Sequence, residues 1–216
     1  GTFNLLDYAR TNDIKKFLFF SSGSIYGKQF ISRSKIKENH YGYLDPLDLR
    51  SCYSESKRMG ENICISFSKK YKINTSIVRP FHTFGPGFSL DDGRVFADFI
   101  KNVIREENII VKGDGLAKRC FCYISDATIG FLAVMLNGEN SEAYNIGNPD
   151  NEISINDLAL TLVNLYPKLN LKIKHINIDR GLSYLTSNLK QSKPSILKAK
   201  KIGFNPKISV KDGFFK

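Results

Sequence analysis

The chain has 216 residues, of which 42% are hydrophobic and 25% charged, and its 32 Lys and Arg outnumber 21 Asp and Glu to give a formal net charge of +11. This balance excludes an intrinsically disordered chain, and a chain of this length can bury roughly 70% of its unfolded surface. Because no run approaches the ~18 apolar residues of a membrane span and residues 1–10 lack the zones of a signal peptide, we expect a soluble, cytoplasmic protein.

The positive charge does not by itself identify a partner. The basic residues are mostly Lys, spread along the chain in ones and twos, without an Arg-rich helix, a zinc motif or an aromatic RNA-binding signature. We therefore expect neither a nucleic acid nor a membrane as partner. The four cysteines form no Cys-x-x-Cys pair, so we expect them to be reduced, with no metal bound and with Cys120 and Cys122 as packing residues.

The first part of the chain predicts a strand–helix–strand unit. A helix ends near Arg10, and the apolar run 15–22 is typical of a strand buried on both faces of a parallel sheet. Apolar positions set among charges predict a helix over 53–70, and the β-branched segment 74–79 predicts a second strand that stops at a proline. Such units build parallel sheets.

The rest of the chain continues this mixed pattern without a repeat, a low-complexity linker or a clean domain boundary. We expect helices over 95–105, 126–136 and 155–165, strands over 109–112, 119–124 and 143–146, and a Lys-rich amphipathic tail. A dinucleotide-binding fold opens with a strand, a Gly-rich turn and a helix that hold the pyrophosphate. This chain starts instead inside a predicted helix, and the expectation is that the sequence begins in the middle of a domain.

Tyr53 and Lys57 form the first candidate catalytic pair. They stand four residues apart on a predicted helix, so their side chains share one face, and an ammonium beside a phenol lowers its pKa from about 10 toward the range of a general base. One Tyr-x-x-x-Lys is expected by chance in this composition, so the spacing alone indicates no more than a solvated helix pair. Ser21 and Ser22, however, end the preceding strand, at the edge where open α/β sheets bind ligands.

Six motifs then follow in a recognisable order: FLFFSSGSIYG, YSESK, RPFHTFGPG, GDGLAKRCFCYISD, YNIGNP and KAKKIGFNPKISVKDG. This succession resembles the extended short-chain dehydrogenase/reductase superfamily, in its NAD-dependent nucleotide-sugar epimerase/dehydratase branch, over essentially the whole chain. The resemblance implies an α/β fold: a Rossmann-like doubly wound parallel sheet lacking its N-terminal strands, with a smaller C-terminal α/β substrate-binding subdomain.

The resemblance also implies an organisation and an assembly. Residues 1–79 would be the remainder of the NAD-binding Rossmann domain and 80–216 mainly the nucleotide-sugar binding region, with 125–147 returning to the Rossmann domain. Relatives commonly form homodimers through a four-helix bundle, here from the helix ending near Arg10 and the helix that starts at Tyr53. We expect the isolated chain neither to bind NAD nor to fold stably alone. The products of this chemistry usually enter bacterial surface polysaccharides.

In the family pattern, Ser22 matches the residue that hydrogen-bonds the reacting sugar hydroxyl, and Tyr53 matches the catalytic base. Lys57 matches the residue that holds the nicotinamide ribose and lowers the pKa of the tyrosine. Together with Tyr53 and Lys57, the expected cofactor-binding residues are Ser21, Pro80 and Phe81.

Three further residues are expected to bind the substrate along with Ser22. His82 stands where the family commonly has Asn, although a plain loop histidine is an equal reading. Arg119 matches the arginine that clamps the nucleotide diphosphate, a task suited to a permanently charged fork. Arg94 matches a substrate contact, and its alternative is a helix-start residue that faces water.

The residues after Ser22 separate the activities of the branch. The 4,6-dehydratases carry Asp-Glu there and the UDP-glucuronate decarboxylases a Glu in the second place, whereas this chain has Gly23 and Ser24. A 4-epimerase, which passes through a 4-keto sugar nucleotide and needs no such acid, is therefore the leading expectation. The motifs DGRVFADFI and RPFHTFGPG favour the alternative, a UDP-glucuronate decarboxylase or dTDP-glucose 4,6-dehydratase type lyase. A third possibility is a catalytically incompetent fragment.

Overall fold

The computed structural model describes residues 1–27, 35–177 and 193–215. Its helices are α1 (Thr2–Thr11), η1 (Gly23–Tyr26), α2 (Ser51–Tyr71), α3 (Val95–Ile104), α4 (Ile124–Asn137), α5 (Ile155–Leu165), η2 (Pro167–Leu169), α6 (Leu197–Lys201) and α7 (Val210–Phe215). Its strands are β1 (Phe17–Phe20), β2 (Thr75–Pro80), β3 (Thr83–Phe84), β4 (Ile109–Lys112), β5 (Lys118–Cys120), β6 (Cys122–Tyr123), β7 (Glu142–Ile146), β8 (Glu152–Ser154) and β9 (Ile173–Ile176).

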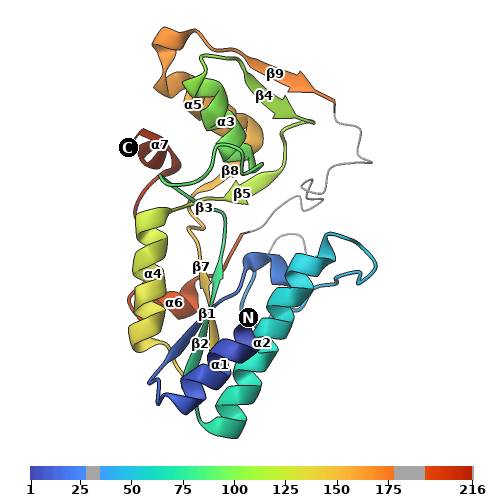
Figure 1. Ribbon diagram of the computed structural model, residues 1–216. Helices are drawn as coiled ribbons and strands as arrows, with labels where there is room; N and C mark the ends of the chain where they lie inside the picture. The colour runs from blue at the N-terminus through green and yellow to red at the C-terminus, as the bar shows by residue number, and fades with distance from the viewer. Residues whose placement is uncertain (28–34, 178–192, 216) are drawn as a thin grey trace.

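A three-stranded parallel sheet of order β1-β2-β7 organises the first lobe. Helices α1 and α2 lie against one face and α4 and α6 against the other (Figure 1). In β1 the side chains alternate as a strand requires, since Phe17 and Phe19 pack with the α1–α2 cluster and Leu18 with the α4–α6 cluster. The parallel α/β class that the motifs implied is therefore present.

Gly60 sets how closely α2 approaches this sheet. A Cβ at position 60 would lie 2.3 Å from the ring of Phe19, a distance that no packed carbon pair tolerates. Glycine costs helix stability in a helix interior, but here it lets the backbone of α2 rest directly on β1.

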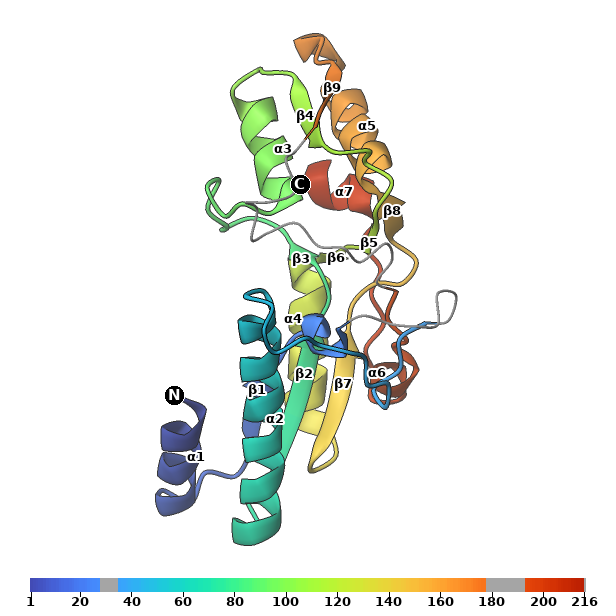
Figure 2. The same ribbon diagram turned by 90° about the vertical axis from the view of Figure 1, so that its right-hand side faces the viewer.

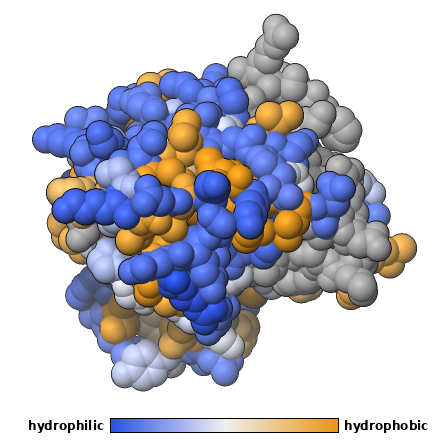
Figure 3. Space-filling view, turned by 90° about the horizontal axis from the view of Figure 1, so that it is seen from above, coloured by the Kyte–Doolittle hydropathy of each residue, from blue (hydrophilic) through white to orange (hydrophobic). Residues whose placement is uncertain are grey.

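The second lobe contains α3, α5, the parallel pair β4–β9, the antiparallel pair β5–β8, and α7 (Figure 2). Its core is aromatic, with Phe84, Phe96, Phe99, Phe121 and Phe214 all buried in one cluster. Figure 3 looks down on this lobe, where hydrophilic side chains surround patches of hydrophobic ones. The chain passes repeatedly between the lobes, because β6 leads into α4 and β7 returns to the first sheet.

The structure differs from the sequence prediction at two strands. The strand predicted over 119–124 is two strands, because the chain changes partner at Phe121: β5 pairs with β8 and β6 with β3. The side chain of Phe121 is buried between Phe84 and Phe96, at ring-centre distances of 5.9 and 6.3 Å. The strand over 15–22 is shorter than predicted and only half-buried, and Phe20 is 47% exposed, because among the described residues β1 pairs on one side only.

The remaining predicted helices and strands agree with the structure to within three residues at their ends, and the short β3, β8 and β9 were not predicted. Within the described part of the chain, no helix combines the length and the apolar character needed to cross a lipid bilayer.

Candidate active site

Two serines at the carboxyl end of β1 begin the site. Ser21 extends the strand by donating its backbone N–H to the oxygen of Val78 (2.8 Å), and Ser22 caps η1, with its Oγ accepting a hydrogen bond from the N–H of Ser24 (3.1 Å). Ser21 is buried, and among the described residues the Oγ atoms of Ser21 and Ser24 have no hydrogen-bond partner. An unpaired buried hydroxyl costs stability, and a ligand group that bonded to either Oγ atom would relieve that cost.

Tyr53 and Lys57 stand on α2 beside this edge, as predicted. The ammonium of Lys57 lies 5.8 Å from the centre of the Tyr53 ring and 5.4 Å from that of Phe19, and it donates a hydrogen bond to the backbone oxygen of Phe20 (2.7 Å). Tyr53 is 48% exposed. The structure therefore brings this face of α2 against Phe20, the last residue of β1, which directly precedes Ser21 and Ser22.

Pro80 and Phe81 end the neighbouring strand. Pro80 is paired in register with Ile146, whose backbone oxygen accepts a hydrogen bond from the N–H of Phe81 (2.8 Å). The ring of Phe81 is buried and stacks on Tyr26 at a centre distance of 6.0 Å, and a Cβ at Gly23 would come within 3.0 Å of it. Phe81 therefore packs against both ends of η1, at Gly23 and at Tyr26.

His82, Arg94 and Arg119 share one electrostatic neighbourhood. His82 adopts a left-handed backbone with φ +28°, and its oxygen accepts a hydrogen bond from the N–H of Cys122 (3.2 Å). His82 is an exposed residue, yet partial desolvation and the positive charges of Arg119 and Arg94 all lower its pKa, so His82 is neutral at pH 7. Desolvation also lowers the pKa of Arg119, which remains cationic.

Arg94 stands at the N-cap of α3, at the rim of a cavity of about 440 Å³ lined by residues 83–89 and the start of α3. Its guanidinium lies 4.8 Å from the centre of the Phe96 ring and pairs with Asp92, with 2.9 Å between Nη2 and Oδ2. The Arg94 hydrogen bond lowers the pKa of Asp92, which keeps that carboxylate ionised. Arg94 therefore lines the cavity, and the carboxylate of Asp92 balances part of its positive charge.

The arrangement fits the nicotinamide and ribose of a dinucleotide. The unpartnered Oγ of Ser21, the ammonium of Lys57 and the phenol of Tyr53 gather at one sheet edge, and these are the groups that would bind amide and sugar hydroxyls. The sequence contains no Gly-rich turn of the kind that binds a pyrophosphate. The three residues therefore fit only the nicotinamide and its ribose, and not the pyrophosphate of the cofactor.

Cys120 and Cys122 are buried. Burial raises the pKa of Cys120 and of Cys122 to about 12, which makes both unreactive thiols, and they belong to different strand pairs. No group of three His, Cys, Asp or Glu side chains in residues 1–27, 35–177 and 193–215 is placed to hold a metal ion.

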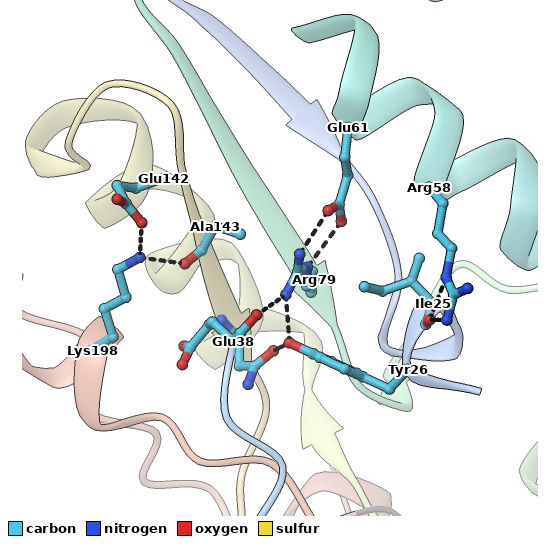
Figure 4. A network of polar contacts seen from close by, with 10 residues as sticks. Ile25, Tyr26, Glu38, Arg58, Glu61, Arg79, Glu142, Ala143 and Lys198 are labelled. Atoms are coloured by element: carbon cyan, nitrogen blue, oxygen red, sulfur yellow. Dashed lines mark hydrogen bonds and ion pairs between the residues drawn. The ribbon is translucent and has the colours of Figure 1, made fainter. Parts of the chain in front are cut away.

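Sequence reasoning missed a buried polar network that lies behind the site (Figure 4). Arg79 is its centre, and Tyr26 is one of its partners. The available signals were a charged residue, Arg79, in a predicted strand and a carboxylate, Glu61, four residues after Lys57 on α2.

Comparison with known proteins shows the family of this chain. The family model described as "NAD dependent epimerase/dehydratase family" matches residues 1–147. The curated UDP-glucuronic acid decarboxylase 5 of Arabidopsis thaliana is 34% identical over 99% of the chain and 59% of its own length. The chain thus spans about three fifths of that relative.

Solved structures give the same picture. The UDP-glucuronic acid 4-epimerase of Bacillus cereus, in complex with UDP-glucuronic acid and NAD, is 26% identical and superposes with a TM-score of 0.81 over 98% of this chain and 63% of its own. The dTDP-glucose 4,6-dehydratase of Bacillus anthracis in complex with NAD shares the fold, with a TM-score of 0.83 over 99% of this chain and 64% of its own at 20% identity.

Proposed function

The chain belongs to the NAD dependent epimerase/dehydratase family, and from this premise we propose that the natural full-length protein is a 4-epimerase of a nucleotide-diphosphate sugar, with UDP-glucuronic acid as its substrate. The observation that supports the chemistry is the juxtaposition of Ser22, Tyr53 and Lys57 at the carboxyl end of β1. The family is NAD-dependent, and NAD, when bound, supplies the acceptor and later the donor of the C4 hydride.

Each of the three side chains has a distinct task in this mechanism. Tyr53 takes the proton of the C4 hydroxyl as the C4 hydride leaves, and it returns a proton to the oxygen when the ketone is reduced from the other face. Lys57 holds its positive charge 5.8 Å from the centre of the Tyr53 ring and would hydrogen-bond the ribose of the cofactor. Ser22 hydrogen-bonds the reacting oxygen and keeps it aligned with Tyr53.

The choice of substrate rests on two relatives. The Arabidopsis relative is named for UDP-glucuronic acid, and the Bacillus cereus structure contains it. We propose that Arg119 and Arg94 bind the anionic part of this substrate, since both place positive charge near His82, and that neutral His82 donates or accepts a hydrogen bond there.

The choice of epimerisation rests on η1. Its sequence between Ser22 and Tyr26 is Gly23-Ser24-Ile25, so it offers no carboxylic acid to the 4-keto sugar. A 4-keto glucuronate is a β-keto acid: when its C5–C6 bond breaks, carbon dioxide leaves and the electron pair forms an enolate, which an acid then protonates at C5. An edge without a carboxylic acid to protonate C5 therefore favours an epimerase.

The second candidate is a UDP-glucuronate decarboxylase, because a 34% identical relative bears that name. It shares the same oxidation at C4 and differs only in the fate of the ketone. Both activities would supply nucleotide sugars for surface polysaccharides.

One incubation tests both candidates. The natural full-length protein is mixed with NAD and UDP-glucuronic acid, and the products are separated and identified by NMR. The C4 epimer with all six sugar carbons retained is the expected product. Carbon dioxide with a pentose nucleotide supports the decarboxylase instead. If the protein converts UDP-glucuronic acid to neither product, the result contradicts the proposed function.

We also propose that α1 and α2 pair with their copies in a second chain as a four-helix bundle. The two helices lie side by side in Figures 1 and 2, with Leu6 and Cys64 buried between them and apolar side chains left exposed, among them Phe3, Tyr8 and Met59. Light scattering tests this assembly: the double variant Tyr8→Lys, Met59→Lys should be monomeric where the natural protein is dimeric.

A further inference from the structure

We propose that Arg79, held by Tyr26 and Glu61, is a positioning residue that fixes Ser22 relative to Tyr53 and Lys57. This inference rests on the proposed function, since it concerns the same site. Arg79 touches none of those three residues in the contacts described above, so its effect passes through η1 and α2.

Arg79 is buried on β2, and its guanidinium binds three separate segments (Figure 4). It donates to both carboxylate oxygens of Glu61 on α2 (2.9 and 2.6 Å), to the Oη of Tyr26 at the end of η1 (2.8 Å), and to the backbone oxygen of Glu38 (2.7 Å). The bidentate fork to Glu61 fixes an angle as well as a distance.

The contact with Tyr26 reaches the Ser22 side of the site. Burial raises the pKa of Tyr26, so its hydroxyl stays protonated, and it donates to the Oδ1 of Asn145 on β7 (2.6 Å) while accepting from Arg79. Tyr26 ends the single 3-10 turn that Ser22 caps. Because that turn is short, fixing the Tyr26 hydroxyl against β2 and β7 restricts where Ser22 lies.

The contact with Glu61 reaches the other side. Glu61 follows Lys57 by four residues on α2, and Lys57 follows Tyr53 by four, so the three side chains lie along one stripe of the helix. Between them, Arg58 donates to the backbone oxygen of Ile25 in η1 (2.8 and 2.6 Å). Arg79 and Arg58 thus bind α2 and η1 to each other.

Stability alone does not account for this arrangement. A buried ion pair contributes little net stability over apolar side chains of the same volume, because desolvation offsets the attraction. What the network adds is geometry, since it joins β2, α2, η1 and β7 through bonds of fixed direction. A shift of about 1 Å in a reacting group can reduce a rate by roughly 100-fold.

The test uses three variants of the natural full-length protein: Tyr26→Phe, Glu61→Gln and, as a matched control, Glu142→Gln. Glu142 pairs with Lys198 and lines the same cavity of about 780 Å³ as Arg79 and Glu61, but it contacts neither η1 nor α2 in the described bonds. Steady-state turnover, NAD binding by calorimetry, and hydrogen–deuterium exchange of residues 21–27 are measured on each folded variant.

The expected result is a fall in kcat of at least ~10-fold in Tyr26→Phe and Glu61→Gln, with KM and the Kd for NAD within about two-fold of the natural values. Exchange in residues 21–27 should rise in both variants, and Glu142→Gln should change neither quantity. Unchanged kcat in both network variants, unchanged exchange, or an equal loss in the control would overturn the inference. A failure of the proposed function can be distinguished from a failure of this inference. Full turnover in Tyr53→Phe would contradict the proposed function, whereas the hydrogen–deuterium exchange of residues 21–27 tests the network without any turnover.

Discussion

The sheet edge around Ser22, Tyr53 and Lys57 and the network around Arg79 adjoin the same helix, yet their polar groups are in opposite states. At the edge, Tyr53 is about half exposed and the Oγ of Ser21 has no hydrogen-bond partner among the described residues. In the network, Arg79 is buried and makes four hydrogen bonds. The edge thus keeps a hydroxyl that lacks a partner among the described residues, whereas the polar groups of the network are paired with one another.

This difference predicts that the two regions fail in different ways. A change at the edge should remove chemistry and preserve folding, whereas a change in the network should lower stability as well as rate. Four measurements examine that division.

The largest effect is expected at Tyr53. In the natural full-length protein, Tyr53→Phe should lower kcat by about 10³-fold, because the general base is lost while the aromatic ring remains. Single-turnover absorbance at 340 nm measures hydride transfer, and calorimetry with the nucleotide sugar serves as the control for binding. Normal turnover in this variant would contradict the assignment of the edge as the catalytic region.

A large loss of stability is expected at Arg79. Arg79→Met should cost roughly 3–5 kcal/mol in the free energy of unfolding, because it leaves the Glu61 carboxylate buried without its partner. The double variant Arg79→Met, Glu61→Met should recover much of that loss, since it removes both charges. Denaturant unfolding checks both numbers; equal losses in the single and double variants would mean that the ion pair is not the source.

A smaller effect is expected where α2 rests on the sheet. Gly60→Ala should cost about 1–3 kcal/mol of stability, because its methyl group would overlap the ring of Phe19. Asn62→Ala, two residues along the same helix and exposed, provides the comparison for helix propensity alone. If both variants are equally stable, the close approach at Gly60 is not a constraint.

The smallest effect is expected from the pH dependence of His82. The pKa of His82 in the folded protein lies below the ordinary value of 6.5. The unfolded chain therefore binds a proton at His82 first, and the contribution of His82 to the free energy of unfolding, which is full above pH 6.5, declines as the pH falls from 6.5 toward the folded pKa. His82→Gln should therefore lose less stability between pH 7 and pH 4 than the natural protein does. An imidazole titration by NMR with a midpoint at or above 6.5 would reverse the sign.

Much of the fold could be predicted because the first lobe obeys local rules. A continuous apolar run marks β1, a 3.6-residue pattern marks α2, and family motifs fall at strand ends. The pairing change at Phe121 could not be predicted, because three consecutive buried residues read equally well as one continuous strand.

The candidate site shows the same limit. The spacing of Tyr53 and Lys57 is a local signal, and the structure places both beside the end of β1 as predicted. Arg79, Tyr26 and Glu61 come from three segments of the chain, and only the fold shows that their side chains meet. The candidate catalytic residues could thus be named from the order of the family motifs, while the residues of the Arg79 network could be found only from tertiary contacts.

The repeated passage of the chain between the two lobes has a consequence for protein engineering. Segments β3 to β6 and β8 to β9 lie with the second lobe, while α4, β7 and α6 lie with the first, and α7 packs in the second lobe's core. Neither lobe is a continuous stretch of sequence. A chimera that exchanged the second lobe for that of a relative would need several splice junctions, and a single crossover point would divide both cores.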